Sequence, residues 1–147
     1  MKKSILILIL ISLLLTSSCS FVKKQSLVLE EPGVFIDVVI QYKGGQKVNE
    51  LFQKVTWYDI LEVDTLEEAE LDIAPSREAL KGLDGIEYSL VFEDRSYTEK
   101  IAISYEWVSK EDLMLLSSIV PYGQDLEISD YKKALEVLES QGFTKRA

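Results

Sequence analysis

The sequence predicts an α+β fold: an antiparallel β-sheet built from two hairpins and packed against two or three helices. Two observations carry this prediction. Apolar residues alternate with polar ones in two pairs of segments, and each pair is joined by a turn sequence. Stretches with helical spacing and helix-capping residues lie between and after those pairs. Antiparallel hairpins interrupted by helices are typical of this class.

The first hairpin is expected over residues 34–57. Its first strand places large side chains on one face at Val34, Ile36, Val38, Ile40 and Tyr42. Gly44-Gly45 follows, and this pair suits a tight turn because glycine tolerates positive φ. The second strand is expected from about Lys47 to Trp57, although its alternation is less regular.

A helix is expected to begin at Asp64 or Thr65, with acidic residues in its first turn that interact favourably with the helix dipole. Pro75 lacks an N–H group and clashes with the preceding helical turn. We therefore expect Pro75 to kink or split this helix. Glycines at 82 and 85 should close the element.

The second hairpin has the clearest alternation in the chain. Its first strand is expected from Ile86 to Glu93, and a turn follows at residues 94–96. In the next strand, one face carries Tyr97, Ile101, Ile103, Tyr105 and Trp107. This spacing predicts that Trp107 lies in the core, where strand aromatics are most often found.

Two further helices are expected. A short one covers about Lys110 to Ser118 and is capped by Ser109. The last begins near Ser129 and ends at Gly142, where Phe143 should cover the helix end as in a Schellman motif.

The first 18 residues have the three-part layout of a secretory signal, with Lys2 and Lys3, an apolar run to Leu15, and small residues that lead to Cys19. This layout resembles a bacterial lipoprotein signal, in which the cysteine is lipidated and becomes the new N-terminus. A lone cysteine has no disulfide partner in its own chain, and lipidation explains its presence. Ordinary cleavage nearby or an uncleaved anchor are the alternatives, since Thr16 stands where such signals usually carry leucine.

We therefore expect a signal peptide at 1–18, a lipidated cysteine with a tether at 19–27, and one α+β domain at 28–147. Removal of the signal peptide takes away two lysines and no acid, which changes the net charge from −9 to −11. So acidic a net charge argues against nucleic acid as a partner, because nucleic acid requires a basic face. Histidine is absent, and with it the commonest general base and metal ligand. We expect no metal and no cofactor.

Several segments together resemble one family, the YehR-like small bacterial lipoproteins. They are the signal with Cys19, Tyr42-Lys43-Gly44, the acidic helix start at 65–69, the segment 81–86 and the C-terminal stretch 128–145. The resemblance covers nearly all of the mature chain and consists mainly of turn glycines, a cap and apolar faces. It implies one α+β domain on a lipid anchor and a proline accepted inside a kinked helix. It implies no functional residues.

Two groups of residues are candidate sites. The acidic stretch from Asp59 to Asp72 contains no glycine and has no calcium-loop spacing, so a solvated helix face is the better interpretation. Trp57 and Tyr58 could contribute to an aromatic platform for a sugar or a peptide, because both rings combine a large apolar surface with a polar group.

The function expected from the sequence is that of a non-catalytic binding or envelope-interaction module. It would be lipid-anchored on the extracytoplasmic side of a cell membrane or outer membrane. Its partners would be that membrane and an unidentified envelope protein or small ligand. A scaffolding role through protein contacts is a related possibility. The alternative is a small carboxylate-dependent hydrolase acting on envelope polymer, which would need two acids across a cleft.

Overall fold

A computed structural model describes residues 21–60, 65–120 and 122–146 of the chain, with the side chains of residues 60 and 72–76 excepted. The export segment with Cys19, and residues 61–64 of the acidic stretch, lie outside the described residues. The elements are the strands β1 (Lys23–Glu31), β2 (Val34–Lys43), β3 (Gln46–Trp57), β4 (Ile86–Phe92), β5 (Ser96–Ser104) and β6 (Thr144–Lys145), and the helices α2 (Leu66–Arg77), α3 (Lys110–Ile119) and α4 (Tyr131–Ser140). Short 3-10 turns are η1 (Tyr58–Ile60), η2 (Glu78–Leu80) and η3 (Gly123–Asp125).

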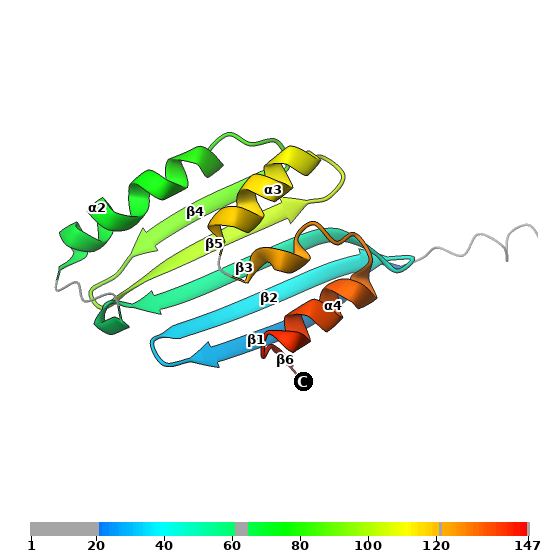
Figure 1. The fold of residues 1–147 in the computed structure, drawn as a ribbon, viewed down its shortest axis with the longest axis horizontal. Coiled ribbons are helices and arrows are strands. Elements are labelled where there is room, and N and C mark those ends of the chain that lie inside the picture. The colour runs from blue at the N-terminus through cyan, green and yellow to red at the C-terminus, as the bar shows by residue number, and fades with distance from the viewer. Residues whose placement is uncertain (1–20, 61–64, 121, 147) are drawn as a thin grey trace, which may run out of the picture.

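The six strands of the described residues form one antiparallel sheet in the order β4-β5-β3-β2-β1-β6, and the helices lie over one of its faces (Figure 1). The α+β class and the antiparallel sheet are thus confirmed. The sheet is wider than two hairpins could make it, because a strand at each end of the domain, β1 and β6, extends it on one side.

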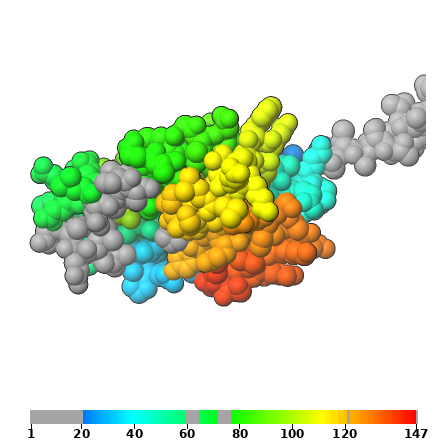
Figure 2. Space-filling model, turned by 45° about the horizontal axis from the view of Figure 1, so that its top comes forward, coloured from blue at the N-terminus to red at the C-terminus, as the bar shows by residue number. Residues whose placement is uncertain are grey.

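The core fills the space between the sheet and the helical layer. Every second residue of the central strands points into it, and α3 and α4 contribute the opposite wall. Its fully buried side chains include Leu27, Ile36, Val38, Ile40, Ile101, Leu116 and Leu138. Figure 2 shows α3, η3 and α4 side by side as a continuous layer.

The segment expected to be a tether is largely strand. β1 begins at Lys23 and pairs with β2 from Lys23↔Tyr42 to Glu31↔Val34. It becomes a strand because Leu27 and Leu29 alternate into the core, and because β2 offers it an unpaired edge. Only residues 20–22 remain between the predicted lipidation site and the sheet.

The local signals for the helices work largely as expected. Ser109 caps α3 by accepting the N–H of Asp112 at 3.0 Å, and Thr65 caps α2 by accepting the N–H of Glu68 at 3.2 Å. At the end of α4, the N–H of Phe143 donates to the Leu138 carbonyl, which forms the expected Schellman motif.

Pro75 does not split its helix. α2 (Leu66–Arg77) includes position 75, so the split is wrong, whereas a proline accepted within the helix is what the family resemblance implied. No helix of the described residues is long and apolar enough to cross a membrane.

Gly85, the residue before β4, packs closely against backbone atoms of the segment after β5. Its φ is +75°, and a Cβ atom there would lie 2.5 Å from the Val108 nitrogen and 2.9 Å from the Trp107 carbonyl carbon. The Ser104 N–H donates to the Gly85 carbonyl at 2.8 Å, which holds the end of β5 against this point. Glycine is therefore required here for two reasons, conformation and space.

Gly85→Ala should destabilise the protein more than Gly82→Ala. Gly82 has a φ of +81° but no atom within 4 Å of its would-be Cβ, so its substitution costs only the strain of positive φ, about 1 kcal/mol. Gly85→Ala adds a clash with backbone atoms, for a further ~1–3 kcal/mol. Urea unfolding of both variants measures the difference, and equal costs would contradict the close approach of residues 104–108.

Candidate functional site

The face of the sheet opposite the described helices is hollowed. Residues of β2, β3, β4 and β5 line a depression with a volume of about 560 Å³. We call it the open-face hollow, and the residues that line it are Val39, Gln41, Asn49, Glu50, Leu51, Gly85, Ile86, Glu87, Ala102, Ile103, Ser104 and Trp107.

The strand register orders this lining into rows. Val39, Leu51 and Ala102 are direct neighbours across β2, β3 and β5, and they make an apolar floor. The next row is polar: Gln41, Asn49 and Ser104. Within it, the Asn49 Nδ2 group donates to the Gln41 Oε1 atom at 3.0 Å. The hollow thus presents an apolar surface beside amide and hydroxyl groups.

Trp107 stands beside this floor, which corrects the expectation that it lies in the core. β5 ends at Ser104, whose carbonyl accepts the N–H groups of Trp107 at 3.1 Å and Val108 at 3.0 Å. This turn interrupts the alternation that puts Ile101 and Ile103 inside, so Trp107 emerges with 69% of its surface exposed.

Such a lining suits a ligand with a flat apolar surface and polar edges. An exposed indole stacks on such a surface, and the neighbouring amides can fix its orientation. A sugar ring and a short peptide both have this character. Sequence reasoning missed the floor, although Val39 gave a signal: it is apolar at a position where the alternation of β2 calls for a polar residue.

The structure separates Trp57 and Tyr58. Trp57, 39% exposed, lines a second hollow of about 540 Å³ together with Pro32, Phe35 and Asp59. Tyr58 is buried and donates its hydroxyl to the Glu93 carbonyl at 2.7 Å. The two rings do not form one platform, and ligand binding by either stays a prediction. Cys19 lies outside the described residues.

The acidic stretch gives no metal site in the part of the chain that the structure describes. Among those residues, no group of three or more potential ligands could hold a metal ion.

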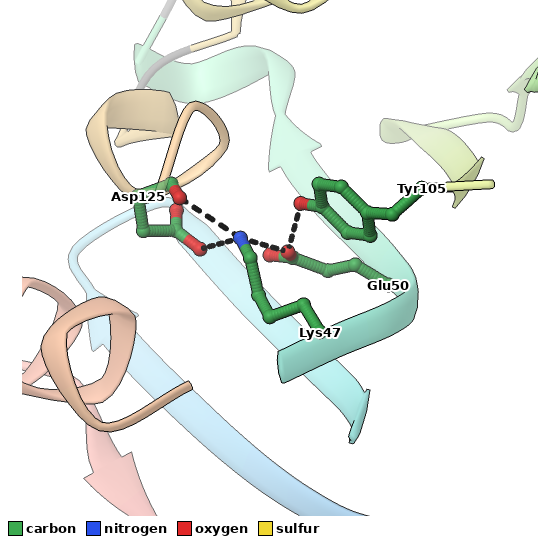
Figure 3. A network of polar contacts seen from close by, with 4 residues as sticks. All are labelled: Lys47, Glu50, Tyr105 and Asp125. Atoms are coloured by element: carbon green, nitrogen blue, oxygen red, sulfur yellow. Dashed lines mark hydrogen bonds and ion pairs between the residues drawn. The ribbon is translucent and has the colours of Figure 1, made fainter. Parts of the chain in front are cut away.

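A buried polar network lies beneath η3 (Figure 3). The Lys47 Nζ atom donates to the Glu50 carboxylate at 2.9 Å, to the Asp125 carboxylate at 3.3 Å and to the Asp125 carbonyl at 2.8 Å. Tyr105 donates its hydroxyl to Glu50 at 2.6 Å, and its ring lies 4.6 Å from the same Nζ atom. The side chains of the lysine and both acids are 0–2% exposed.

Two carboxyl groups and one ammonium group share this enclosed space. Burial, together with the negative charge of Glu50, raises the pKa of Asp125 from 3.8 to about 8. Burial and the same charge raise the pKa of Tyr105, so its hydroxyl remains a donor. The surroundings of Asp125 thus favour its protonated form at neutral pH.

A second buried ion cluster lies under α2. The Glu99 carboxylate is approached by Arg77 and, at 3.9 Å, by Lys54, and it accepts the Tyr88 hydroxyl at 3.2 Å. Burial lowers the pKa of Lys54 more than the charge of Glu99 raises it. In both clusters the buried charged groups have partners of opposite charge, which offset the cost of their burial.

Asp125→Asn should reduce the pH dependence of stability. The folded protein keeps a proton on Asp125 that the unfolded chain releases at an ordinary pKa of 3.8, so this group's stabilising contribution falls as the pH rises toward about 8. Asparagine does not titrate and can hydrogen-bond like the protonated acid. We expect the variant to match the parent near about pH 4 and to exceed its free energy of unfolding by several kcal/mol near about pH 8, because each pH unit between the two pKa values contributes about 1.4 kcal/mol.

Urea unfolding at both pH values provides the measurement. Asp84→Asn, which removes an exposed acid, is the matched control and should follow the parent. If the free energy of unfolding changed with pH equally in the parent and in Asp125→Asn, protonation of Asp125 in the folded protein would be contradicted.

Comparisons with known proteins agree with this fold. The chain is 23% identical over 140 residues to the uncharacterized lipoprotein Lin0239 of Listeria innocua, a match that covers 95% of this chain and 92% of the relative. It superimposes on the NMR structure of the YehR protein of E. coli with a TM-score of 0.71 and 19% identity, over 86% of this chain and 92% of that one.

A second solved structure, of a protein from Streptococcus pneumoniae TIGR4, gives a TM-score of 0.61 at 14% identity, with 89% of this chain and 88% of that chain covered. The predicted resemblance to the YehR-like proteins is thus confirmed. A family described as "Protein of unknown function (DUF1307)" matches residues 23–144, from the first residue of β1 to the first of β6. The chain belongs to this DUF1307 family.

Proposed function

We propose that the protein is a lipoprotein, anchored through acylated Cys19 on the extracytoplasmic side of a bacterial cell membrane or outer membrane. Its domain binds an envelope ligand or partner in the open-face hollow and does not catalyse a reaction. The observation that carries the binding role is the exposure of Trp107 beside an apolar floor on the sheet face opposite the described helices. A large aromatic ring in such a position is typical of a recognition surface.

Two observations support the anchor. The three-part signal ends at the single cysteine of the chain. The match to the Listeria lipoprotein covers 95% of the chain, more than residues 21–147 could account for, so it extends into the export segment. Two or three acyl chains give durable anchoring, because each buried CH₂ group contributes about 0.8 kcal/mol.

The hydrolase alternative would need two carboxyl groups across an accessible cleft, one of them with a raised pKa. Asp125 has a raised pKa, but it is 1% exposed, is held by Lys47 and lines neither hollow. The geometry of this acid supports packing and not hydrolysis.

Cys19→Ala should move the protein from the membrane fraction to the soluble fraction of cells, because it removes the acylated thiol. The measurement is fractionation with mass spectrometry of the mature N-terminus, and Ser20→Ala is the matched control that should stay with the membranes. If the Cys19→Ala protein still sedimented with membranes, lipid anchoring through Cys19 would be contradicted.

A photo-crosslinking residue at position 51 should capture a discrete partner in cells. Leu51 lies on the floor of the open-face hollow and is 41% exposed, whereas Leu71 on α2 is 74% exposed and far from it, which makes it the control position. Trp107→Ala in the same protein should lower the yield at position 51 at least about tenfold, the effect of losing roughly 1.4 kcal/mol of stacking. Equal products from positions 51 and 71 would argue against the hollow as a binding site.

A further inference from the structure

Three parts of the chain meet at one end of the sheet. β1 begins there, since Lys23 pairs with Tyr42 near the end of β2. The β2–β3 turn lies beside it, and the N–H of Tyr131, the first residue of α4, donates to the Gly45 carbonyl of this turn at 2.9 Å. The rings of Tyr42 and Tyr131 stack with centroids 3.7 Å apart. Figures 1 and 2 show the start of α4 next to this turn.

This end carries a concentration of lysines, which we call the basic end. Its five members are Lys23, Lys24, Lys43, Lys132 and Lys133. All five are exposed, and none makes an ion pair with another described residue. In contrast, Lys81 and Lys145 are paired with Glu78 and Glu139. A cluster of unpaired cations is unexpected in a chain with a net charge of −9.

The acids nearest to these lysines are Asp130 and the exposed Glu136 of α4, and neither forms an ion pair with them among the described residues. Asp130 is half-buried, and its carboxylate accepts the Lys133 N–H at 3.0 Å as the cap of α4. The exposed acids Asp84, Glu87 and Glu106 belong to the other half of the same end, around β4 and the end of β5. The basic end is therefore confined to β1, the β2–β3 turn and α4.

The two residues that precede β1 are apolar and uncovered. Phe21 is 81% exposed and Val22 is 55% exposed. Phe21 is two residues from Cys19, so their Cα atoms lie within about 7 Å of each other. A lipid on Cys19 therefore brings these apolar side chains and the basic end to the bilayer surface, with no tether long enough to keep them away.

We propose that the basic end docks on the anionic headgroups of a phospholipid bilayer, with Phe21 and Val22 in the interface. Lysines attract anionic headgroups within a Debye length of the surface, and exposed apolar residues next to an anchor add contact area. The role of the anchor in cells rests on the proposed function. Docking places the strands upright on the membrane and the Trp57 hollow at the opposite strand ends, because β3 begins at the basic end and Trp57 is its last residue.

The test couples the mature chain, residues 19–147, to vesicles through Cys19, the only thiol, with a maleimide lipid. This tether does not depend on acylation in cells, so docking can fail or succeed separately from the proposed anchor. Vesicles of phosphatidylcholine alone are compared with vesicles that also contain phosphatidylglycerol. A water-soluble amine-acylating reagent and mass spectrometry then give the labelling rate of each lysine.

We expect labelling of Lys43, Lys132 and Lys133 to fall at least threefold on the anionic vesicles and to recover in high salt. Lys100, which is exposed and unpaired on the open face of the sheet, should keep one rate throughout. Equal rates for the three lysines on both vesicles would overturn the proposal. Protection that appears only in intact cells, and never on vesicles, would also overturn it in favour of an acidic protein partner.

Charge reversal supplies the second arm. The triple variant K43E/K132E/K133E should raise the labelling of Lys23 and Lys24 on anionic vesicles to the phosphatidylcholine level. A control with the same charge change away from the basic end, K81E/K100E/K145E, should retain their protection. Equal labelling rates of Lys23 and Lys24 in the two variants would show that the net charge of the protein governs its contact with the membrane. Docking by the basic end would then be wrong.

Discussion

The arrangement of the helical layer on the sheet depends on one lysine. Lys47 lies near the start of β3, and its ammonium group holds η3 through both the side chain and the carbonyl of Asp125. Its own N–H donates to the Ser129 carbonyl at 2.8 Å, just before α4. One residue thus fixes the chain between α3 and α4 in relation to the first hairpin. Because these groups are buried, a helical layer in another position would remove two hydrogen-bond acceptors of the Lys47 ammonium group and leave the Asp125 carboxyl group without Lys47, at a high cost in free energy.

This constraint also determines which face of the sheet is covered by helices and which is exposed to solvent. With α3, η3 and α4 held over one face, the opposite face of β2, β3 and β5 is left to solvent, and Val39, Leu51 and Trp107 remain accessible there. The same contacts place the start of α4 beside the β2–β3 turn. The candidate binding hollow and the basic end are therefore consequences of how one buried network positions the helices.

Local signals in the sequence were sufficient for much of the fold. The alternation in β2 and β4, the glycine pair between β2 and β3, the cap at Ser109 and the Schellman end at Gly142 and Phe143 all work through neighbours in the chain. β3 is an instructive exception. Its alternation is irregular because Glu50, Lys54 and Thr56 occupy core-facing positions. Glu50 is satisfied by Lys47 of the same strand and by Tyr105, and Lys54 lies near Glu99 of β5. No local pattern can distinguish such a buried charge from a solvated one.

The sequence by itself determined the fold class, the helix caps and turns, and the export signal that predicts a lipid on Cys19, since each depends on residues close together in the chain. Only the tertiary structure decided that residues 23–27 join the sheet, that Trp107 turns outward, and that Lys47 meets Asp125, which lies 78 positions away. These outcomes depend on which strand edges meet and where a strand stops against Gly85. Such contacts arise from packing across the whole domain. The hydrophobic periodicity of the sequence between the contacting residues does not predict them.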